Sequence, residues 1–460
     1  MSSANAEQQM PSVAETLAAA VAGLQPEHLP AALRGMAENL VLDIFGLCLA
    51  ARGTDYVRAA LDATDGDGNC TVFGHARTCD SSGAALVNGV AAHGEDFDDT
   101  FEGGPVHAGA VIVPAVLAAV ERFALDGKTA LLGIAVGVET ICRLSLVAPR
   151  LVHKAGFHPT SVFGAPAAAA AVGAALRLNA AQLTDALGIA GSMASGIIEY
   201  LADGSWTKRL HPGWAAQAGL RAALLARQGF HGPRTVFEGT HGLFNGFARR
   251  SDGNYAKLTG EFGREWVAET LAFKPFACGT MTHPYIDCAI RLAARGIEAE
   301  AIESIVCEVA EGTVHRLWEP LALKQAPPNP YAGKFSGPFC VAVGFVTGDA
   351  GLAAFTEATV ADPRIRALAA KVRFVVDPAN PYPDNYTGHL RATLRDGSVI
   401  EERQPHLRGG AHEKLSFTAI EAKFRANAAF GGLTAARTDA VRALAATLFD
   451  GPIALADLRV

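Results

Sequence analysis

Apolar residues recur at three- and four-residue spacing along most of the first 270 residues, which is the period of a helix with a buried face. Several of these segments are apolar nearly all round, as helices at the centre of a bundle are. Half of all residues are hydrophobic, so we expect closely packed helices. The spacing predicts helices over Ser12 to Leu24, Pro30 to Arg52, Val106 to Leu125, Thr129 to Leu146, Ser161 to Leu176, Ala180 to Leu201 and Pro212 to Gln228.

Beyond about residue 300 the pattern changes to short strands. Ser304 to Val309 and Val372 to Val376 are predicted strands, and Phe335 to Val346 is a predicted helix. Two further strand segments flank Asp396-Gly397, a dipeptide that is a strong hairpin signal. This part of the chain therefore resembles a compact α+β unit inserted into a helical protein.

The length of 460 residues exceeds the usual size of one hydrophobic core, so two domains are expected. We predict a mainly α fold with an α+β second domain. Residues 1–269 would form the N-terminal part of a large helical domain, residues 270–404 a smaller α/β domain, and residues 405–460 helices that rejoin the first domain. In this last segment Thr418 and Glu421 have the spacing of a capping box.

Charge and targeting signals limit the cellular role. The net charge is −7 and the sequence has no basic stripe, so we expect no nucleic-acid partner. Met1 to Met10 is polar and lacks the features of a signal or transit peptide. Uninterrupted apolar runs such as Ala108 to Val120 are shorter than the roughly 18 residues of a membrane span. The sequence predicts a cytoplasmic protein without a membrane partner.

The cysteines point to a reducing environment. All eight are scattered along the chain and none forms a CxxC pair. We expect them to be reduced thiols in the core, and their spacing offers no ligand set for an iron–sulfur cluster.

The most informative polar cluster lies between residues 96 and 107. Asp96, Asp98, Asp99 and Thr100 place three carboxylates and a hydroxyl within five residues, although only 18% of the chain is charged. His107 follows at the start of a long apolar helix. Carboxylates beside a histidine at a helix N-terminus are typical of sites where protons move on anionic substrates.

Other interpretations of this cluster are weaker. The residues spell DxDxT, the nucleophile loop of haloacid-dehalogenase-type phosphatases, but that loop follows a buried strand and here Ala84 to His93 has helical spacing. A paired-aspartate Mg²⁺ site would need a second acidic cluster, which is not evident in the sequence. A solvated acidic loop at a helix end is the remaining alternative.

Five motifs follow one another along the chain. They are Asn88-Gly89 with His93 and Asp96 to Thr100, His107 to Val111, Gly156 to Ser161, Asp203 to Gly213, and Phe273 to Cys278. Together they resemble the MmgE/PrpD family, which includes 2-methylcitrate dehydratases, cis-aconitate decarboxylases and iminodisuccinate epimerases. The resemblance runs over nearly the whole chain, as far as Lys423 to Asn427.

The resemblance implies a homodimer in which both chain ends form the helical domain and the α/β domain forms a lid over the active site. It implies that neither a metal nor an organic cofactor is used. The positions that match the family's site residues are Asp96, Thr100, His107, His158, Lys208 and Lys274. Arg209 and His283 are further candidates for substrate binding.

The chemistry of the family explains these residue types. Its substrates are dicarboxylates and tricarboxylates, and the shared step is proton transfer at a carbon next to a carboxylate. Lys208 and Lys274 would neutralise the carboxylate and stabilise an enolate-like state, with His107 assisting. His158 or Asp96 would supply the acid and the base, and a desolvated lysine could also act as the base.

Two positions depart from the decarboxylase pattern. His107-Ala108-Gly109 stands where decarboxylases have His-Pro-Ser, and Gly279 stands where they have a further active-site histidine. These departures argue against cis-aconitate decarboxylation and also against strict specificity for 2-methylcitrate. From the resemblance as a whole we expect a cofactor-independent lyase of the 2-methylcitrate dehydratase type. An epimerase on the same scaffold is the alternative, and a non-catalytic metabolite-binding protein is a third.

Overall fold

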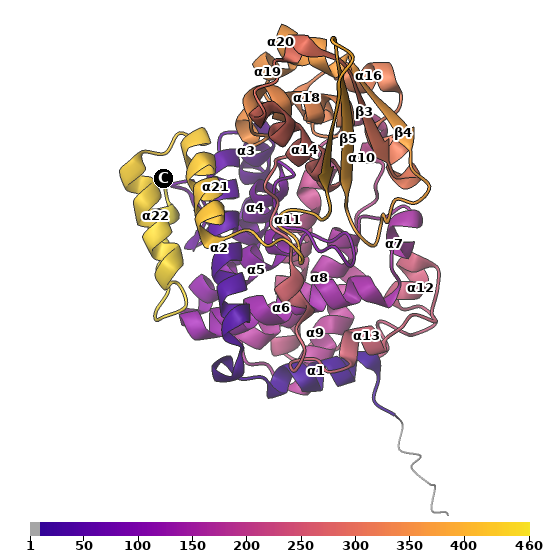
Figure 1. The fold of residues 1–460 in the computed structure, drawn as a ribbon. Helices are drawn as coiled ribbons and strands as arrows, with labels where there is room; N and C mark the ends of the chain where they lie inside the picture. The colour runs from indigo at the N-terminus through magenta and orange to yellow at the C-terminus, as the bar shows by residue number, and fades with distance from the viewer. Residues whose placement is uncertain (1–9) are drawn as a thin grey trace, which may run out of the picture.

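A bundle of helices surrounds α8 (Pro159–Ala175) in the computed structural model, which describes residues 10–460 (Figure 1). Every residue of α8 is buried, and the helix packs against α5, α6, α9 and α11. The other helices of this part are α1 (Val13–Gly23), α2 (Ala31–Ala51), α3 (Asp55–Asp62), α4 (Ser81–His93), α5 (Gly109–Phe123), α6 (Gly127–Val147), α7 (Leu151–Lys154), α9 (Ala180–Met193), α10 (Tyr200–Asp203), α11 (Thr207–Arg227), α12 (Leu243–Ala248) and α13 (Ala256–Thr259).

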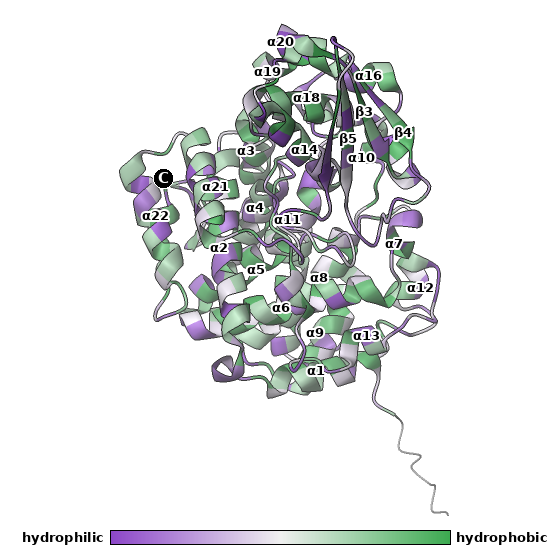
Figure 2. Cartoon of the chain, in the orientation of Figure 1, coloured by the Kyte–Doolittle hydropathy of each residue, from purple (hydrophilic) through white to green (hydrophobic). Residues whose placement is uncertain are grey.

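Apolar residues predominate along these helices, as Figure 2 shows for α5 and α9. Helix α6 is long and apolar enough to cross a membrane by length and composition, yet 94% of its apolar window is buried inside the protein. It also carries a buried ion pair between Glu139 and Arg143. The expectation from uninterrupted apolar runs overlooked this helix, because these two charges interrupt the run. Its burial is that of a core helix.

A four-stranded sheet forms the second part of the fold, at the top of Figure 1. Its strands are β3 (Ile302–Val309), β4 (Val372–Val376), β5 (Gly388–Leu394) and β6 (Val399–Gln404), in the order β4-β3-β5-β6. Strands β3 and β4 are parallel, and β5 and β6 form the predicted hairpin, with Gly397 at a φ of 87°. A separate two-stranded ribbon pairs β1 (Cys70–Thr71) with β2 (Thr78–Cys79).

Short helices surround this sheet. Helix α14 packs against β5, β6 and α18, and α18 in turn packs against α20. The helices of this part are α14 (His283–Ala294), α15 (Val314–Leu317), α16 (Leu321–Gln325), α17 (Pro330–Gly333), α18 (Gly337–Thr347), α19 (Glu357–Ala361) and α20 (Pro363–Ala369). The predicted fold class, mainly α with a smaller α+β part, is confirmed, while the domain boundaries at residues 269 and 404 stay a prediction.

The chain end returns to the helical part, where α21 (Phe417–Phe430) packs against α2 and α22 (Ala435–Thr447) follows. Lys423 of α21 is buried and forms an ion pair of 2.8 Å with Asp43 of α2. The predicted capping box at Thr418 and Glu421 is wrong. Ser416 caps α21 instead, through the N–H of Ala419, and so the helix begins earlier than the spacing suggested.

The predicted helix over Ala180 to Leu201 is too long. Helix α9 ends at Met193, and Gly196 has a φ of 113°, which breaks the helical backbone. The carbonyl of Gly196 accepts a hydrogen bond of 2.8 Å from the N–H of His158. The break in the helix therefore allows Gly196 to bind the backbone at the start of α8.

All eight cysteines are buried free thiols, as the sequence predicts.

Glycine fixes the crossing of α4, which ends just before the acidic segment, and α11, which carries Lys208 in its first turn. A Cβ atom at Gly213 would lie 2.1 Å from the carbonyl oxygen of Leu86, and a Cβ at Gly89 would lie 2.5 Å from the Cα of Gly213. These distances are shorter than any van der Waals contact. The two helices touch backbone to backbone, which brings Lys208 to the acidic segment.

The substitution Gly213→Ala should lower the free energy of unfolding by about 1–3 kcal/mol, because an added methyl group forces the helices apart. The control Gly35→Ala lies in α2 with no atom within 4 Å of the added Cβ. It should stabilise by roughly 0.5–1 kcal/mol through helix propensity. Urea unfolding measures both, and equal effects of the two substitutions would refute the close-contact explanation.

Candidate active site

A cavity of about 1130 Å³ lies between the helical part and the segment that joins β3 to α18. Its wall mixes imidazoles, cations and aromatic rings. The side chains that matter for its chemistry are Glu95, His107, His153, His158, Tyr200, Lys208, Arg209, His315, Arg316, Lys324, Tyr331, Lys334 and Phe335. Of the residues predicted from the sequence, His107, His158, Lys208 and Arg209 therefore line one cavity.

Asp96 is buried behind this wall between two lysines. Its Oδ2 lies 3.0 Å from Nζ of Lys208, and its Oδ1 lies 3.0 Å from Nζ of Lys274. The same Lys274 ammonium donates to the backbone oxygen of Asp96 at 2.9 Å. Asp96 has a φ of 55°, a left-handed conformation that a non-glycine residue adopts only when its surroundings hold it there.

These ion pairs decide the protonation of Asp96. Burial alone raises the pKa of the Asp96 carboxyl, but the charges of Lys208 and then Lys274 outweigh it and hold the pKa well below its usual range. Burial lowers the pKa of Lys274, but the charges of Asp96 and Asp98 and the hydrogen bond to Asp96 together outweigh burial and raise the pKa. Both groups stay charged at neutral pH. Asp96 thus acts as an anchor for two cations rather than as a proton acceptor.

Asp98 and Asp99 are also buried, and each has a defined partner. Oδ2 of Asp98 lies 2.8 Å from Nδ1 of His93. The two carboxylate oxygens of Asp99 accept hydrogen bonds of 2.8 Å from the N–H groups of Ala108 and Gly109 at the start of α5. Asp99 therefore caps the helix that follows His107. Neither carboxylate lies in a solvated acidic loop.

His107 is a neutral imidazole with a defined tautomer. Its Nδ1 lies 2.7 Å from the backbone oxygen of Asp99, and a carbonyl oxygen can only accept, so Nδ1 carries the proton. Burial lowers the pKa of His107 to about 3, and the nearby charge of Lys274 acts in the same direction. Nε2 of this cavity-lining ring then carries an unshared lone pair. Such a nitrogen is a proton acceptor ready for substrate.

His158 sits at the other side of the same group of rings, as the N-cap residue of α8. Its Nδ1 lies 3.1 Å from Nδ1 of His211, so one ring donates and the other accepts. Burial, and after it the charge of His93, holds the pKa of His158 well below its usual range. His107 and His158 have ring centroids 6.3 Å apart, and each is oriented from behind by another group.

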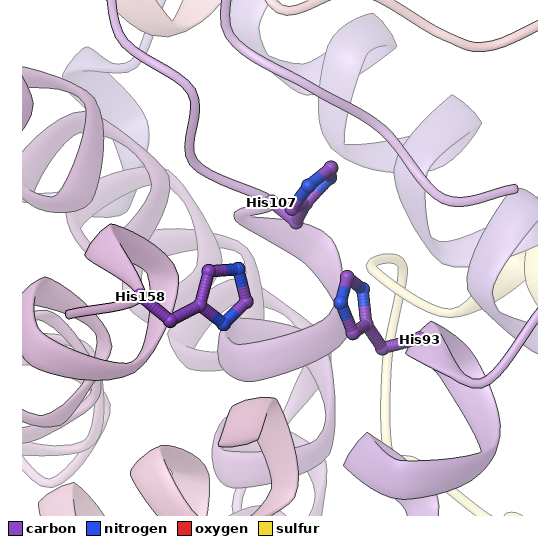
Figure 3. Close-up of side chains that lie close together, drawn as sticks. All are labelled: His93, His107 and His158. Atoms are coloured by element: carbon purple, nitrogen blue, oxygen red, sulfur yellow. The ribbon is translucent and has the colours of Figure 1, made fainter. Parts of the chain in front are cut away.

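His93, His107 and His158 form a cluster whose ring nitrogens lie within 4.8 Å of one another (Figure 3). Rings at this separation could hold a metal ion, although nitrogens that share one tetrahedral zinc ion lie roughly 3.3 Å apart. The charge of Asp98 raises the pKa of His107, whereas the charges of Lys274, His93 and Lys208 lower it. Charges of both signs therefore meet at this ring.

Thr100 and His283 lie outside the cavity wall, as Asp96 and Lys274 do. Thr100 is buried, and its backbone pairs with Ala272 through hydrogen bonds of 2.9 and 2.8 Å. His283 is fully buried at the start of α14, where its Nε2 lies 3.2 Å from the carbonyl oxygen of Cys278. Thr100 holds the Ala272–Lys274 segment against the acidic loop. Substrate contact by either side chain is therefore not supported by this geometry.

The loop from Tyr331 to Ser336 is only a secondary candidate in the sequence, yet it supplies part of the cavity wall. Lys334 is buried, and its Nζ donates to Oε2 and to the backbone oxygen of Glu95 at 2.6 Å each. Arg209 lies over the rings of Tyr56 and Tyr331, at 4.5 and 4.6 Å from their centroids. Lys334 and Tyr331 belong to this loop, and no local sequence motif distinguishes them. Tertiary contact alone reveals their part in the site.

Treatment with EDTA should leave any catalytic activity unchanged, because a neutral His107 in the same cavity wall as the charged Lys208 can accept a proton without a metal ion. The measurement is the rate after dialysis against EDTA, with metal content checked by mass spectrometry. Loss of activity that Zn²⁺ or Fe²⁺ restores would contradict this expectation and would make the His93, His107 and His158 cluster a metal site.

The chain is similar to known proteins over most of its length. The MmgE/PrpD N-terminal domain matches residues 15–256, and the MmgE/PrpD C-terminal domain matches residues 276–448. The cis-aconitate decarboxylase of Mus musculus is 29% identical over 438 residues, which cover 91% of this chain and 87% of the relative. That of Aspergillus terreus is 28% identical over 410 residues, 82% of each chain. The cis-aconitate decarboxylase-like protein oryM of Aspergillus oryzae is 27% identical over 409 residues, 83% of each chain. Two domain matches in sequence order cover most of the chain, which therefore belongs to the MmgE/PrpD family.

Proposed function

We propose that this protein is a cofactor-independent lyase that moves a proton at a carbon next to a carboxylate in a small dicarboxylate or tricarboxylate. The observation that carries the proposal is His107. Its Nδ1 is occupied by a backbone carbonyl, its ring is neutral, and it lines the same cavity as Lys208. A proton acceptor beside a fixed cation is the minimum that this chemistry requires.

The physical problem is the low acidity of a carbon next to a carboxylate. A second negative charge must develop on the carboxylate as the proton leaves, and fixed cations lower its energy. Lys208 is 12% exposed at its side chain and belongs to the cavity wall, so its ammonium can face that charge. Lys274 acts from behind, by adding its charge to the field around Asp96. The two lysines were expected to have equal roles, whereas here Lys208 would contact the substrate and Lys274 would support it from behind the wall.

A dehydratase of the 2-methylcitrate type is the reaction we favour. The departure from the decarboxylase pattern at Gly279 argues against decarboxylation. An added Cβ there would lie 3.3 Å from the ring of Phe335, which lines the cavity, so this chain lacks a side chain at a position next to the cavity wall. In a dehydratase His107 would remove the proton and, as an imidazolium, pass it to the departing hydroxyl, which the neutral ring of His158 would hydrogen-bond.

An epimerase is the second candidate, because two separate imidazoles line the cavity. Epimerisation needs proton removal from one face of the carbon and return to the other, and ring centroids 6.3 Å apart leave room for a carbon between His107 and His158. A non-catalytic metabolite-binding protein is the third candidate, and the intact acid–base groups argue against it.

We expect the protein to act in the cytoplasm as a homodimer. Support for a second copy as partner comes from one face of α11, on which Trp206, Leu210 and Trp214 are 48%, 40% and 45% exposed. Residues four apart share a helix face, so the three form an apolar stripe beside the cavity. No nucleic-acid or membrane partner is proposed.

Proton NMR in D₂O tests the reaction directly, with 2-methylcitrate, citrate, cis-aconitate, malate, tartrate and iminodisuccinate as the panel. A hydro-lyase should produce or consume an alkene signal with one of these compounds. Deuterium uptake without an alkene would identify the epimerase. The variant His107→Asn should slow either reaction by about 10²–10⁴-fold. If the wild-type protein changes no signal, the lyase proposal fails for this substrate class.

The pH dependence should differ from that of an ordinary histidine base. His107 must be neutral to accept a proton, and its pKa is lowered to about 3. As the pH falls from 8 to 5 the base therefore stays unprotonated, and kcat/KM, corrected for substrate ionisation, should not decline near pH 6.5. A fall of kcat/KM centred near 6.5, the ordinary value for histidine, would contradict the assigned base.

A further inference from the structure

A second cationic group lies in the cavity wall on the segment after β3. Arg316 of α15 lines the cavity and is only partly buried. Its Nη2 lies 3.3 Å from Nε2 of His153. Within residues 10–460 no carboxylate forms an ion pair with it, whereas Lys208 and Lys334 in the same wall are each paired with an acid. Most donors of this guanidinium are thus available to a ligand.

His153 holds the guanidinium without neutralising it. Burial lowers the pKa of His153, and the charges of Arg316 and His315 lower it further. The ring is therefore neutral, and its Nε2 accepts the hydrogen bond from Arg316. Because His153 belongs to α7 in the helical part and Arg316 to α15 in the α+β part, this contact connects the two parts of the fold at the cavity wall.

The backbone of Arg316 is also fixed. Nζ of Lys324 donates to the carbonyl oxygens of Arg316 and Phe335 at 2.5 and 2.8 Å. Lys324 therefore ties α15 to the loop that carries Tyr331 and Lys334. A charged side chain on a fixed backbone, held by a neutral imidazole, is a preorganised anion receptor.

Arg316 and Lys208 act on the same region of the cavity. Burial raises the pKa of Tyr200, while the charge of Lys208 and then that of Arg316 lower it. Tyr200 lines the cavity, and the charges of both Lys208 and Arg316 act on its hydroxyl group. One cation belongs to the proton-transfer group around His107, and the other comes from α15. The cavity thus has two places where a carboxylate can be bound.

We propose that Arg316, positioned by His153, binds a substrate carboxylate remote from the carbon that loses its proton. The guanidinium fork matches a carboxylate in bidentate geometry. It would select substrates that carry this additional carboxylate, so a tricarboxylate is preferred over a dicarboxylate that lacks it. This inference rests on the proposed function and names a specificity-determining residue for it.

Steady-state kinetics of Arg316→Gln on the active tricarboxylate test the proposal. KM should rise by about 10–100-fold, because a hydrogen-bonded charge pair is lost. The value of kcat should change by less than about 3-fold, since the interaction is the same in ground and transition states. Arg316→Lys keeps the charge but loses the planar guanidinium, so its KM should lie between those of the wild type and Arg316→Gln. The control Arg250→Gln removes an exposed arginine paired with Asp252 and should leave both constants unchanged.

Binding of propane-1,2,3-tricarboxylate and of glutarate, measured by calorimetry, separates the possible failures. Arg316→Gln should weaken the affinity for the tricarboxylate about 10–100-fold and the affinity for glutarate much less. Wild-type turnover with an unchanged KM and unchanged affinities in Arg316→Gln and Arg316→Lys would overturn the inference and leave the proposed function standing. Wild-type inactivity on every substrate would overturn the proposed function, and the calorimetric difference would still decide the inference. If Arg316→Gln does not fold, His153→Gln should raise KM without lowering kcat, and an unchanged KM would overturn the positioning role.

Discussion

The buried ion pairs of Asp96 are the interaction on which the rest of the site depends. A carboxylate cannot be buried as an anion without compensation, and here Lys208 and Lys274 supply it from two distant segments. Lys208 comes from the first turn of α11, and Lys274 from the segment that pairs with Thr100. The acidic loop thus collects cations from separate parts of the chain into one place. Only the complete fold assembles the site.

The same principle connects the other carboxylates of the loop to their surroundings. Glu95 pairs with Lys334, which ties the loop before α18 to the helical part. The backbone oxygen of Phe97 accepts a hydrogen bond of 2.7 Å from Lys423, so α21 supports the loop from below. Contacts from α21 and from the loop before α18 thus both hold the acidic loop. The backbone oxygen of Asp99, which sets the tautomer of His107, belongs to this loop.

Periodicity predicted most of the fold because buried helices leave a clear apolar pattern. It placed α2, α5, α6 and the β5–β6 hairpin within a few residues. It failed at α9, where Gly196 ends a pattern that remains apolar, and at α21, where Ser416 rather than Thr418 is the cap. Sequence spacing does not reveal which of several polar residues a tertiary contact uses.

The sequence named many of the residues that meet at the candidate site but not how they are arranged there. The motifs brought together the residues that the structure also brings together around Asp96, because the family resemblance carries spatial information. The motifs could not distinguish residues that line the cavity from residues that support it. Asp96 and Lys274 lie behind the cavity wall, and Thr100 pairs with the backbone of Ala272. Arg316 and His153 carry no motif at all. Their proximity depends on how α7 and α15 face each other, which no local pattern encodes.

The central claim is that His107 is a neutral proton acceptor with its proton on Nδ1. Nitrogen-15 NMR of selectively labelled histidines, with the His107 signals assigned by their loss in His107→Asn, measures this directly. The account predicts a protonated Nδ1 and an unprotonated Nε2 at every pH from 5 to 8. A ring protonated at Nε2, or an imidazolium that forms near pH 6, would contradict it.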